Sequence, residues 1–329
     1  MVKVKLSTQH PNWPLRQQFP SSKSIWGEYQ FFINDEVEDC DYWIVCEGLL
    51  KRESTLCPPE NTILITWEPP SIKSYSQNFL NQFERLITCH KNLKHKNITY
   101  SHQGLPWHVR KSYDEITSLK NIKKTKNISI ISSNKKCTDS HKKRIEFAYK
   151  IKDYFKDDID LYGRGINDFE DKWDVLAPYK YSIAIENSVL DHYITEKLSD
   201  CYLAHTFPFY HGASNVYKYY NKESFARIDI SNFNKTISTI EKVLNDNNHY
   251  NTHIGHLSEA RDKYMNKWQL FPLIVNFVEL CEKKTWKQKK VCTIEPDSGS
   301  QSLKMSVITR LSSFLLNPVK TGHKYDVFL

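Results

Sequence analysis

The chain carries its densest group of chemically useful side chains between residues 179 and 212. An apolar, strand-like run ends there in Glu186-Asn187, and a short loop then leads to Thr195, which suits the N-cap of a helix. A helix beginning at Thr195 would point unpaired N–H groups and the positive end of its dipole at the loop. Lys197 adds a full charge beside them. The segment therefore predicts an anion site suited to the pyrophosphate of a nucleotide.

Two further side chains of this segment are candidates for ligand contact, Glu196 with a sugar and Tyr193, like Glu186 and Asn187, with the nucleotide donor. Glu196 lies in the first helical turn, where its carboxylate could meet hydroxyls of a sugar ring or an incipient cation at the anomeric carbon. Tyr193 lies in the loop just before the cap. Taken alone, a capped helix with Glu and Lys on a solvated face is unremarkable, so that alternative stays open.

The net charge and the cysteine spacing indicate which partners and which metal sites to expect. The net charge is +8, and the basic residues cluster at 120–126, 135–144 and 283–290. Such a surface suits nucleic acid, an anionic membrane or a phosphate-bearing substrate. We expect no nucleic acid partner, because zinc-finger spacing, a basic zipper and an RNA-recognition signature are missing from the sequence. The eight cysteines form no C-x-x-C pair, which predicts buried free thiols rather than a zinc site.

The hydropathy pattern predicts an α/β fold in two parts. Short apolar runs at 2–6, 41–46, 62–67 and 85–89 read as buried strands of a first open sheet, with helix-length segments such as 71–81 between them. A polar, lysine-rich stretch then precedes a second series of strands, at 128–132, 159–162, 180–185, 206–210 and 226–230. Helices are expected at 138–155, 195–205, 235–245 and 253–284. Ligands would belong at the carboxyl ends of the strands.

These patterns divide the chain into an N-terminal Rossmann-like domain over 1–120, a second Rossmann-like domain over 121–285 and a tail over 286–329. In the tail, apolar residues from Leu303 to Leu315 repeat at helical spacing with basic flanks. We expect either a helix packed on the protein or one lying on an anionic membrane surface. With no signal peptide and no run of 18 apolar residues, we expect a cytoplasmic protein, peripheral on the inner membrane face if the tail binds lipid.

Several spaced motifs within residues 179–212 resemble the signature of the α-1,3/4-fucosyltransferases, glycosyltransferase family 10. They are Glu186-Asn187-Ser188, the run Tyr193-Ile194-Thr195-Glu196-Lys197, and Thr206-Phe207-Pro208-Phe209-Tyr210. The resemblance implies a GT-B fold, in which two Rossmann-like domains face an interdomain cleft. It implies a bacterial-type enzyme, and by it the second domain would bind the donor GDP-fucose, with the acceptor in the first domain.

The same resemblance assigns further residues. Members carry an Arg that pairs with the donor phosphates, on the strand before the donor-domain helix, and Arg144 is the best match, with Lys142 and Lys143 as rivals. In Thr66-Trp67-Glu68-Pro69-Pro70 the matching acid is Glu68, which would act as general base on the acceptor hydroxyl. A structural Glu capping a turn is the alternative. Gly163, after the run 159–162, is either a turn against the nucleotide or a plain loop turn.

The function implied is inverting transfer of L-fucose from GDP-β-L-fucose to the 3- or 4-hydroxyl of an acceptor sugar. We expect an oligosaccharide or glycolipid acceptor, in surface glycan or lipopolysaccharide synthesis, shaped by the loops at 10–20 and 71–82. No cofactor is expected, and a divalent metal is not strictly required if cationic side chains neutralise the pyrophosphate. The alternatives are a transferase for another nucleotide-linked sugar and a catalytically silent carbohydrate-binding protein.

Overall fold

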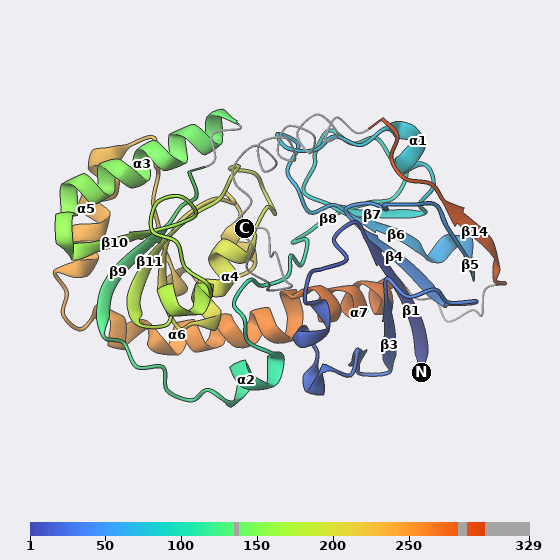
Figure 1. Cartoon of the computed structure of the whole chain (residues 1–329), viewed down its shortest axis with the longest axis horizontal. Coiled ribbons are helices and arrows are strands. Elements are labelled where there is room, and N and C mark those ends of the chain that lie inside the picture. Colours follow the sequence, from blue (N-terminus) through green and yellow to red (C-terminus); the bar gives the residue numbers. More distant parts are fainter. Residues whose placement is uncertain (135–137, 282–287, 300–329) are drawn as a thin grey trace, which may run out of the picture. The chain divides into compact units, whose positions relative to one another are not determined.

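The computed structural model describes residues 1–134, 138–281 and 288–299. Within these ranges the chain forms two compact units. Unit 1 comprises Met1–Arg16, Ser24–Ser101 and the described residues 288–299, and unit 2 comprises Gln17–Lys23 and His102–Cys281. Each unit has its own sheet (Figure 1).

Unit 1 is built on a seven-stranded sheet in the order β2-β3-β1-β4-β6-β7-β8. Its strands are β1 (Val2–Thr8), β2 (Ile25–Trp26), β3 (Tyr29–Ile33), β4 (Tyr42–Cys46), β6 (Thr62–Ile65), β7 (Arg85–Thr88) and β8 (Ile98–Tyr100). All neighbours pair in parallel except β2, which is antiparallel to β3. Every residue of β4 and of β6 is buried, as expected for central parallel strands.

Unit 2 is built on a five-stranded parallel sheet in the order β10-β9-β11-β12-β13. Its strands are β9 (Lys126–Ile131), β10 (Ile159–Tyr162), β11 (Tyr179–Ile185), β12 (Phe207–His211) and β13 (Ala226–Arg227). Its helices are α2 (Tyr113–Ser118), α3 (Asp139–Phe155), α4 (Glu196–Leu203), α5 (Phe233–Leu244), α6 (His249–Lys263) and α7 (Leu270–Cys281), and a π-helical turn, Tyr264–Trp268, joins the last two. Helices α3 and α5 lie side by side and pack through Phe147 and Phe233 (Figure 1).

Both sheets reverse their strand order at one point. In unit 1 the chain goes from β1 outward to β3 and then returns to β4 on the other side of β1. In unit 2 it goes from β9 outward to β10 and returns to β11 on the other side of β9. A crevice opens beyond the carboxyl ends of the strands at such a reversal, and open α/β sheets bind their ligands there. The topology therefore gives each unit one preferred place for a ligand.

The strands and helices that the sequence predicts in unit 2 are confirmed with ends shifted by a few residues, except the single helix expected over 253–284. The structure divides it into α6, the π-helical turn and α7, because the backbone is extended at Gln269. Helix α3 begins after Thr138, whose side chain accepts a hydrogen bond from the His141 N–H, and α4 begins after Thr195 in the same way. The helix expected over 71–81 is wrong in length, because only α1 (Gln77–Leu80) forms. The loop before it carries Pro69 and Pro70, which remove backbone donors.

The division of the chain differs from the expected one. The boundary lies at Ser101 and His102 rather than after residue 120. Trp107, Val109 and Ile116 explain the difference, because they are buried in the apolar core of unit 2. Part of the expected tail belongs to unit 1, where β14 (Lys290–Ile294) pairs antiparallel with β5 (Glu53–Cys57). The amphipathic segment from 303 to 315 lies outside the described residues.

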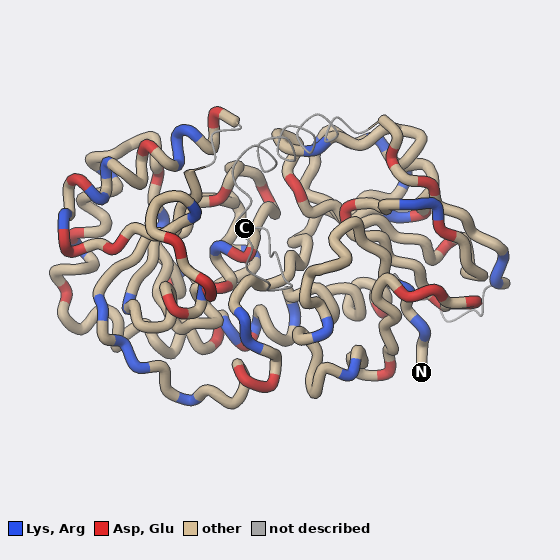
Figure 2. The backbone as a smooth tube through the Cα atoms, in the orientation of Figure 1, with Lys and Arg blue, Asp and Glu red and all other residues tan. Residues whose placement is uncertain are grey.

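The structure also shows the state of the cysteines, the distribution of charge and the character of the helices. Six cysteines with described side chains are free thiols. Five of them are buried as predicted, namely Cys40, Cys46, Cys57, Cys89 and Cys201, and Cys292 is partly exposed. Both basic and acidic residues occur along α3, where Lys142, Lys143 and Arg144 follow one another, and charges of both signs are distributed over the described backbone (Figure 2). In the described part of the chain no helix has the length and apolar character needed to cross a bilayer.

The turn at Gly163 gives the first testable prediction. A Cβ added there would lie 1.8 Å from the Ser132 carbonyl oxygen, and the φ of +148° disfavours other residues. Gly163→Ala should lower the free energy of unfolding by about 1–3 kcal/mol, because strand end and loop would have to separate. Gly255→Ala on α6 is the control, since nothing lies within 4 Å of its added Cβ. It should be neutral or gain about 0.5–1 kcal/mol in denaturant unfolding; equal losses in both variants would contradict this account.

Candidate active site

Residues from four strand ends meet at the carboxyl edge of the unit 2 sheet. Ser133 follows β9, Gly163 follows β10, Glu186 follows β11 and Gly212 follows β12. Their strands are parallel, so these residues share one edge. The packing is tight, since a Cβ on Gly212 would lie 2.5 Å from the Glu186 side chain. The strand-order reversal between β9 and β11 falls within this set.

Glu186 fixes the start of α4. Its carboxylate accepts the Thr195 N–H at 2.8 Å and the Thr195 hydroxyl at 2.6 Å. The Glu186 side chain is fully buried, and burial raises its pKa, although Lys197 pulls in the other direction. Through these two bonds the end of β11 holds the N-terminus of α4 at the carboxyl edge of the sheet, where the sequence analysis expects an anion site.

Lys197 and Glu196 lie together at this helix start. The Lys197 ammonium is 3.0 Å from the Glu196 carboxylate, 3.2 Å from the Thr195 hydroxyl and 3.8 Å from Glu186. Burial alone would raise the pKa of Glu196, but the positive charge of Lys197, with His108 and Lys172, outweighs it and holds this pKa well below its usual range. Glu196 is therefore an anion at neutral pH, held beside a cation.

Arg144 joins the two sides of the strand-order reversal. Its guanidinium donates to the Asn187 side chain after β11 and, at 3.3 Å, to the Ser133 hydroxyl after β9. The resemblance places this Arg on a strand, whereas the hydropathy pattern predicts a helix over 138–155. The structure confirms the helix as α3, and Arg144 reaches the edge from its buried face. Tyr193 is buried close enough to Arg144 to interact with its charge.

The structure thus brings together Glu186, Asn187, Tyr193, Glu196, Lys197, Arg144 and Gly163, all predicted from the sequence. Gly163 forms a tight turn against the Ser132 carbonyl, which is compatible with both alternatives that the sequence leaves open for it. Asp158 and Asp160, the one D-x-D of this region, lie at the opposite, amino end of β10, where Asp160 pairs with Lys126.

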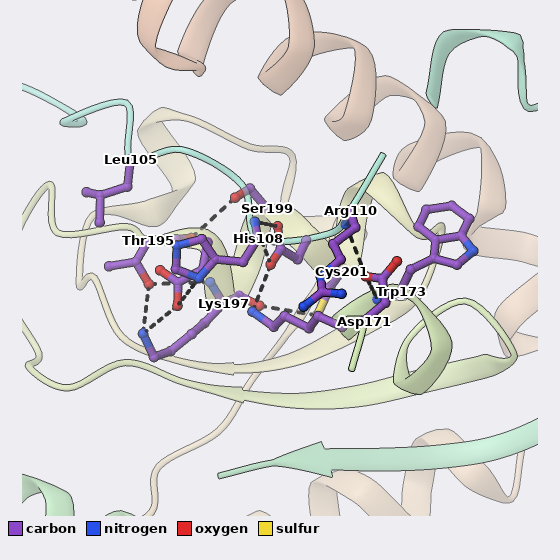
Figure 3. Close-up of polar contacts among 12 residues, drawn as sticks. Leu105, His108, Arg110, Asp171, Trp173, Thr195, Lys197, Ser199 and Cys201 are labelled. Carbon is purple, nitrogen blue, oxygen red and sulfur yellow. Dashed lines mark hydrogen bonds and ion pairs between the residues drawn. The ribbon is translucent and has the colours of Figure 1, made fainter. Parts of the chain in front are cut away.

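A buried ion pair beneath α4 was not predicted from the sequence. Lys172 and Asp200 lie 2.8 Å apart with side chains 5% and 0% exposed. Asp200 also accepts the His108 N–H at 3.1 Å, and the His108 ring lies 3.9 Å from Glu196 (Figure 3). Burial alone would lower the pKa of Lys172, but Asp200 and Glu196 raise it above its usual value. Asp200 lies four residues after Glu196, so the helical spacing places both on the same face of α4 and could have indicated Asp200. Lys172 and His108 have no local sequence pattern that connects them with the site.

The segment around His108 is held on both sides. Asp171 accepts the Arg110 N–H at 3.0 Å and the Trp173 N–H at 2.9 Å (Figure 3). Tyr264 donates to the Leu105 carbonyl at 3.0 Å. This explains why residues 102–111 belong to unit 2: their backbone is hydrogen-bonded to side chains that surround α4.

In unit 1, Glu68 occupies the corresponding edge of its own sheet. It follows β6 and is partly buried, and its backbone carbonyl is hydrogen-bonded to the His90 ring at 2.7 Å. Trp67, the residue before Glu68, belongs to a stack of three rings. The Trp13 ring lies between the other two, with its centroid 4.4 Å from that of His10 and 5.1 Å from that of Trp67. His10 and Trp13 come from the loop at 10–20 that the sequence analysis assigns to an acceptor site.

The unit 2 site has the groups needed to hold a phosphate ester. It combines a helix N-terminus with the cations Arg144 and Lys197, and it has an ionised carboxylate, Glu196, that can accept hydrogen bonds from hydroxyls. Among the described residues, no group of three or more His, Cys, Asp or Glu side chains is placed to hold a metal ion.

Comparisons with known proteins agree with this geometry. Residues 121–296, more than half of the chain, match the family model described as Glycosyltransferase family 10 (fucosyltransferase) C-term. The Helicobacter pylori protein Alpha-(1,3)-fucosyltransferase FucT is 35% identical over 82 residues, which are 25% of this chain. This match spans 17% of the curated relative's length.

A solved structure, described as an α1,3-fucosyltransferase with GDP, aligns with 86% of this chain and 92% of its own. The TM-score is 0.50 and the identity is 18%, so this likeness speaks for the fold alone. Together with two units built on parallel sheets, it confirms the predicted GT-B class.

The buried pair beneath α4 yields a stability prediction. Lys172→Met should lower the free energy of unfolding by about 3–5 kcal/mol, because it leaves Asp200 buried without its cation. Lys142→Met, on an exposed pair of the same unit with side chains 55% and 90% exposed, is the matched control and should change little. Urea unfolding of both variants measures the difference. A loss for Lys172→Met no larger than the control's would show that the pair does not support the site.

Proposed function

Because this chain belongs to glycosyltransferase family 10, the fucosyltransferase family, we propose that it transfers L-fucose from GDP-β-L-fucose to a hydroxyl of an acceptor sugar. One observation carries the proposal. Arg144, Asn187 and Lys197 converge at the α4 N-terminus, at the strand-order reversal of the unit 2 sheet. That is where an open α/β sheet binds a nucleotide, and the groups there suit its phosphates.

In the proposed complex the diphosphate lies against the first turn of α4. Lys197 and Arg144 neutralise its charge, and the Gly163 turn allows the nucleotide to approach the backbone closely. Glu196, kept ionised by its neighbours, accepts hydrogen bonds from sugar hydroxyls or stabilises the positive charge that develops at the anomeric carbon. Cationic side chains can hold the departing GDP in this way, so we propose no cofactor and no strict need for a divalent metal.

The transfer step is proposed to invert the anomeric centre. Glu68 takes the proton of the acceptor hydroxyl as the acceptor oxygen forms its bond to the fucose C1. The bond from C1 to the phosphate oxygen breaks on the opposite face, and its electron pair leaves with GDP. Two observations support this role for Glu68: it lies at the end of a strand of unit 1, and its side chain is partly buried.

The acceptor is proposed to be a glycan, either an oligosaccharide or a glycolipid of surface glycan synthesis. The partly exposed rings of His10 and Trp13 support this, because aromatic faces suit the C–H faces of a sugar ring. The Trp13 ring stacks on the buried ring of Trp67, the residue before Glu68. We further propose that the protein works in the cytoplasm, on the inner face of the membrane.

A thermal-shift panel tests the donor. GDP and GDP-fucose should raise the melting temperature of the purified protein, because both bind only the folded state, whereas UDP and CMP should not. A shift with UDP or CMP would point to another nucleotide-linked sugar. A shift with none of the four would favour a silent carbohydrate-binding protein.

Two variants of helix α3, measured in the same thermal-shift panel, test whether GDP binds at the proposed site. Arg144→Ala should weaken the affinity for GDP by about ten- to a hundredfold, since a hydrogen bond to a charged group contributes about 1.5–3 kcal/mol. Lys142→Ala, which removes an exposed cation two residues away, should leave the shift intact. Equal losses would mean that net charge, and not this site, holds GDP.

Glu68→Gln tests the base. The variant keeps the size of the side chain but cannot take up a proton, so transfer should fall by about 100-fold or more while the GDP shift stays the same. Radiolabelled fucose incorporation measures transfer. Loss of transfer together with a lowered melting temperature would assign Glu68 a structural role instead.

A further inference from the structure

A buried carboxylate of unit 1 lies beside the proposed base and takes no part in the chemistry described so far. Glu47 follows β4 directly, at the strand-order reversal between β1 and β4, and its side chain is 0% exposed. Its φ is +69°, a conformation that costs free energy in residues other than glycine. A strained, buried acid at the ligand-binding edge of a sheet needs a strong set of partners.

The partners of Glu47 come from the turn that carries Glu68. The Oε2 atom accepts the Trp67 N–H at 2.6 Å, the Glu68 N–H at 3.1 Å and the Tyr75 hydroxyl at 2.9 Å. Two consecutive peptide groups are thus bound to one carboxylate oxygen. Bonds of this kind, from N–H donors to an ionised acceptor, are about twice as strong as neutral ones.

Lys73 completes the arrangement from the opposite side. Its buried ammonium lies 3.3 Å from the other carboxylate oxygen of Glu47 and donates to the Glu47 carbonyl at 2.6 Å. It also donates to the Gln9 side chain at 3.3 Å. The pair therefore ties together the loops that follow β1, β4 and β6.

The peptide after Glu68 is held as well. The His90 ring, on the loop after β7, bonds the Glu68 carbonyl, so its Nε2 carries the proton. Burial lowers the pKa of His90, which keeps this ring neutral near pH 7. The backbone of Glu68 is consequently fixed on both sides, by Glu47 at its N–H and by His90 at its carbonyl.

We propose that Glu47 is a positioning residue that sets where the Glu68 carboxylate lies. The inference rests on the proposed function, in which Glu68 takes the acceptor proton. A general base must lie within hydrogen-bond reach of that proton. A misplacement of 1 Å costs about 100-fold in rate, and a fixed backbone at Glu68 limits such movement.

The charge of Glu47 is essential to this role. A glutamine keeps the shape but offers one acceptor oxygen and one NH2 group. Its NH2 would face either Lys73 or the N–H groups of Trp67 and Glu68, and each choice sets donor against donor. Glu47→Gln therefore frees the turn with a minimal change of volume.

The test compares Glu47→Gln with Glu53→Gln. Glu53 is the matched control, because it too joins a buried lysine of unit 1, Lys5 at 3.0 Å, and accepts the Ser7 hydroxyl at 2.8 Å. With GDP-fucose and a glycan acceptor, Glu47→Gln should lower kcat by about 100-fold and leave the KM for GDP-fucose unchanged. Glu53→Gln should leave both constants unchanged. An equal fall in kcat for the two variants would overturn the proposal, because it would reflect general destabilisation.

Amide hydrogen exchange gives a second readout that needs no activity. Exchange at Trp67 and Glu68 should be slow in the wild type, faster in Glu47→Gln and unaltered in Glu53→Gln. Unaltered exchange in Glu47→Gln, or faster exchange with an undiminished kcat, overturns the positioning role. If Glu47→Gln does not fold, Tyr75→Phe removes one donor from the same oxygen and should give a smaller change in the same direction; no change would count against the proposal. A wild type that transfers no fucose refutes the proposed function, while exchange still decides whether Glu47 holds this turn.

Discussion

A carboxylate buried at the end of a parallel strand must receive hydrogen bonds, since an unpaired buried charge costs several kcal/mol. Both units build their ligand-binding edge on this constraint. In unit 2, Glu186 after β11 accepts the N–H and hydroxyl of Thr195 and so fixes the start of α4. In unit 1, Glu47 after β4 accepts the N–H groups of Trp67 and Glu68. Each strand that follows a sheet reversal thus ends in an acid that orders the next loop.

The second requirement is charge balance around α4. Glu186, Glu196 and Asp200 bring three carboxylates into a buried region, and Lys197 and Lys172 compensate them. The balance keeps Glu196 ionised despite its burial. An added anionic diphosphate fits such a site because Arg144 and the helix N-terminus supply further positive charge. The same network of ion pairs that holds the start of α4 thus supplies the groups proposed to bind the ligand.

Much of unit 2 could be predicted because its signals are local. Thr195 caps α4 as the sequence indicates, and strand β10 has the predicted bounds of Ile159–Tyr162. The boundary expected after residue 120 placed the segment 102–118 in the N-terminal domain, but it belongs to unit 2. Its apolar residues have no periodicity that would show which of the two hydrophobic cores they join. Strands β3, β5 and β14 were missed. Strand β14 has no local signal, because it forms only by pairing with β5, more than 200 residues away.

The sequence by itself determined the family, the GT-B class and the residues proposed for the donor site, because helix caps, strand ends and motif spacing are short-range features. Only the tertiary structure decided that Arg144 bonds Asn187 and Ser133, that Lys172 and Asp200 pair beneath α4, and that Glu47 holds the turn of Glu68. Glu47 and Glu68 are 21 residues apart and become neighbours only when β4 and β6 pair in register. A buried acid has no local sequence signature, since its partners are backbone groups that any residue can supply.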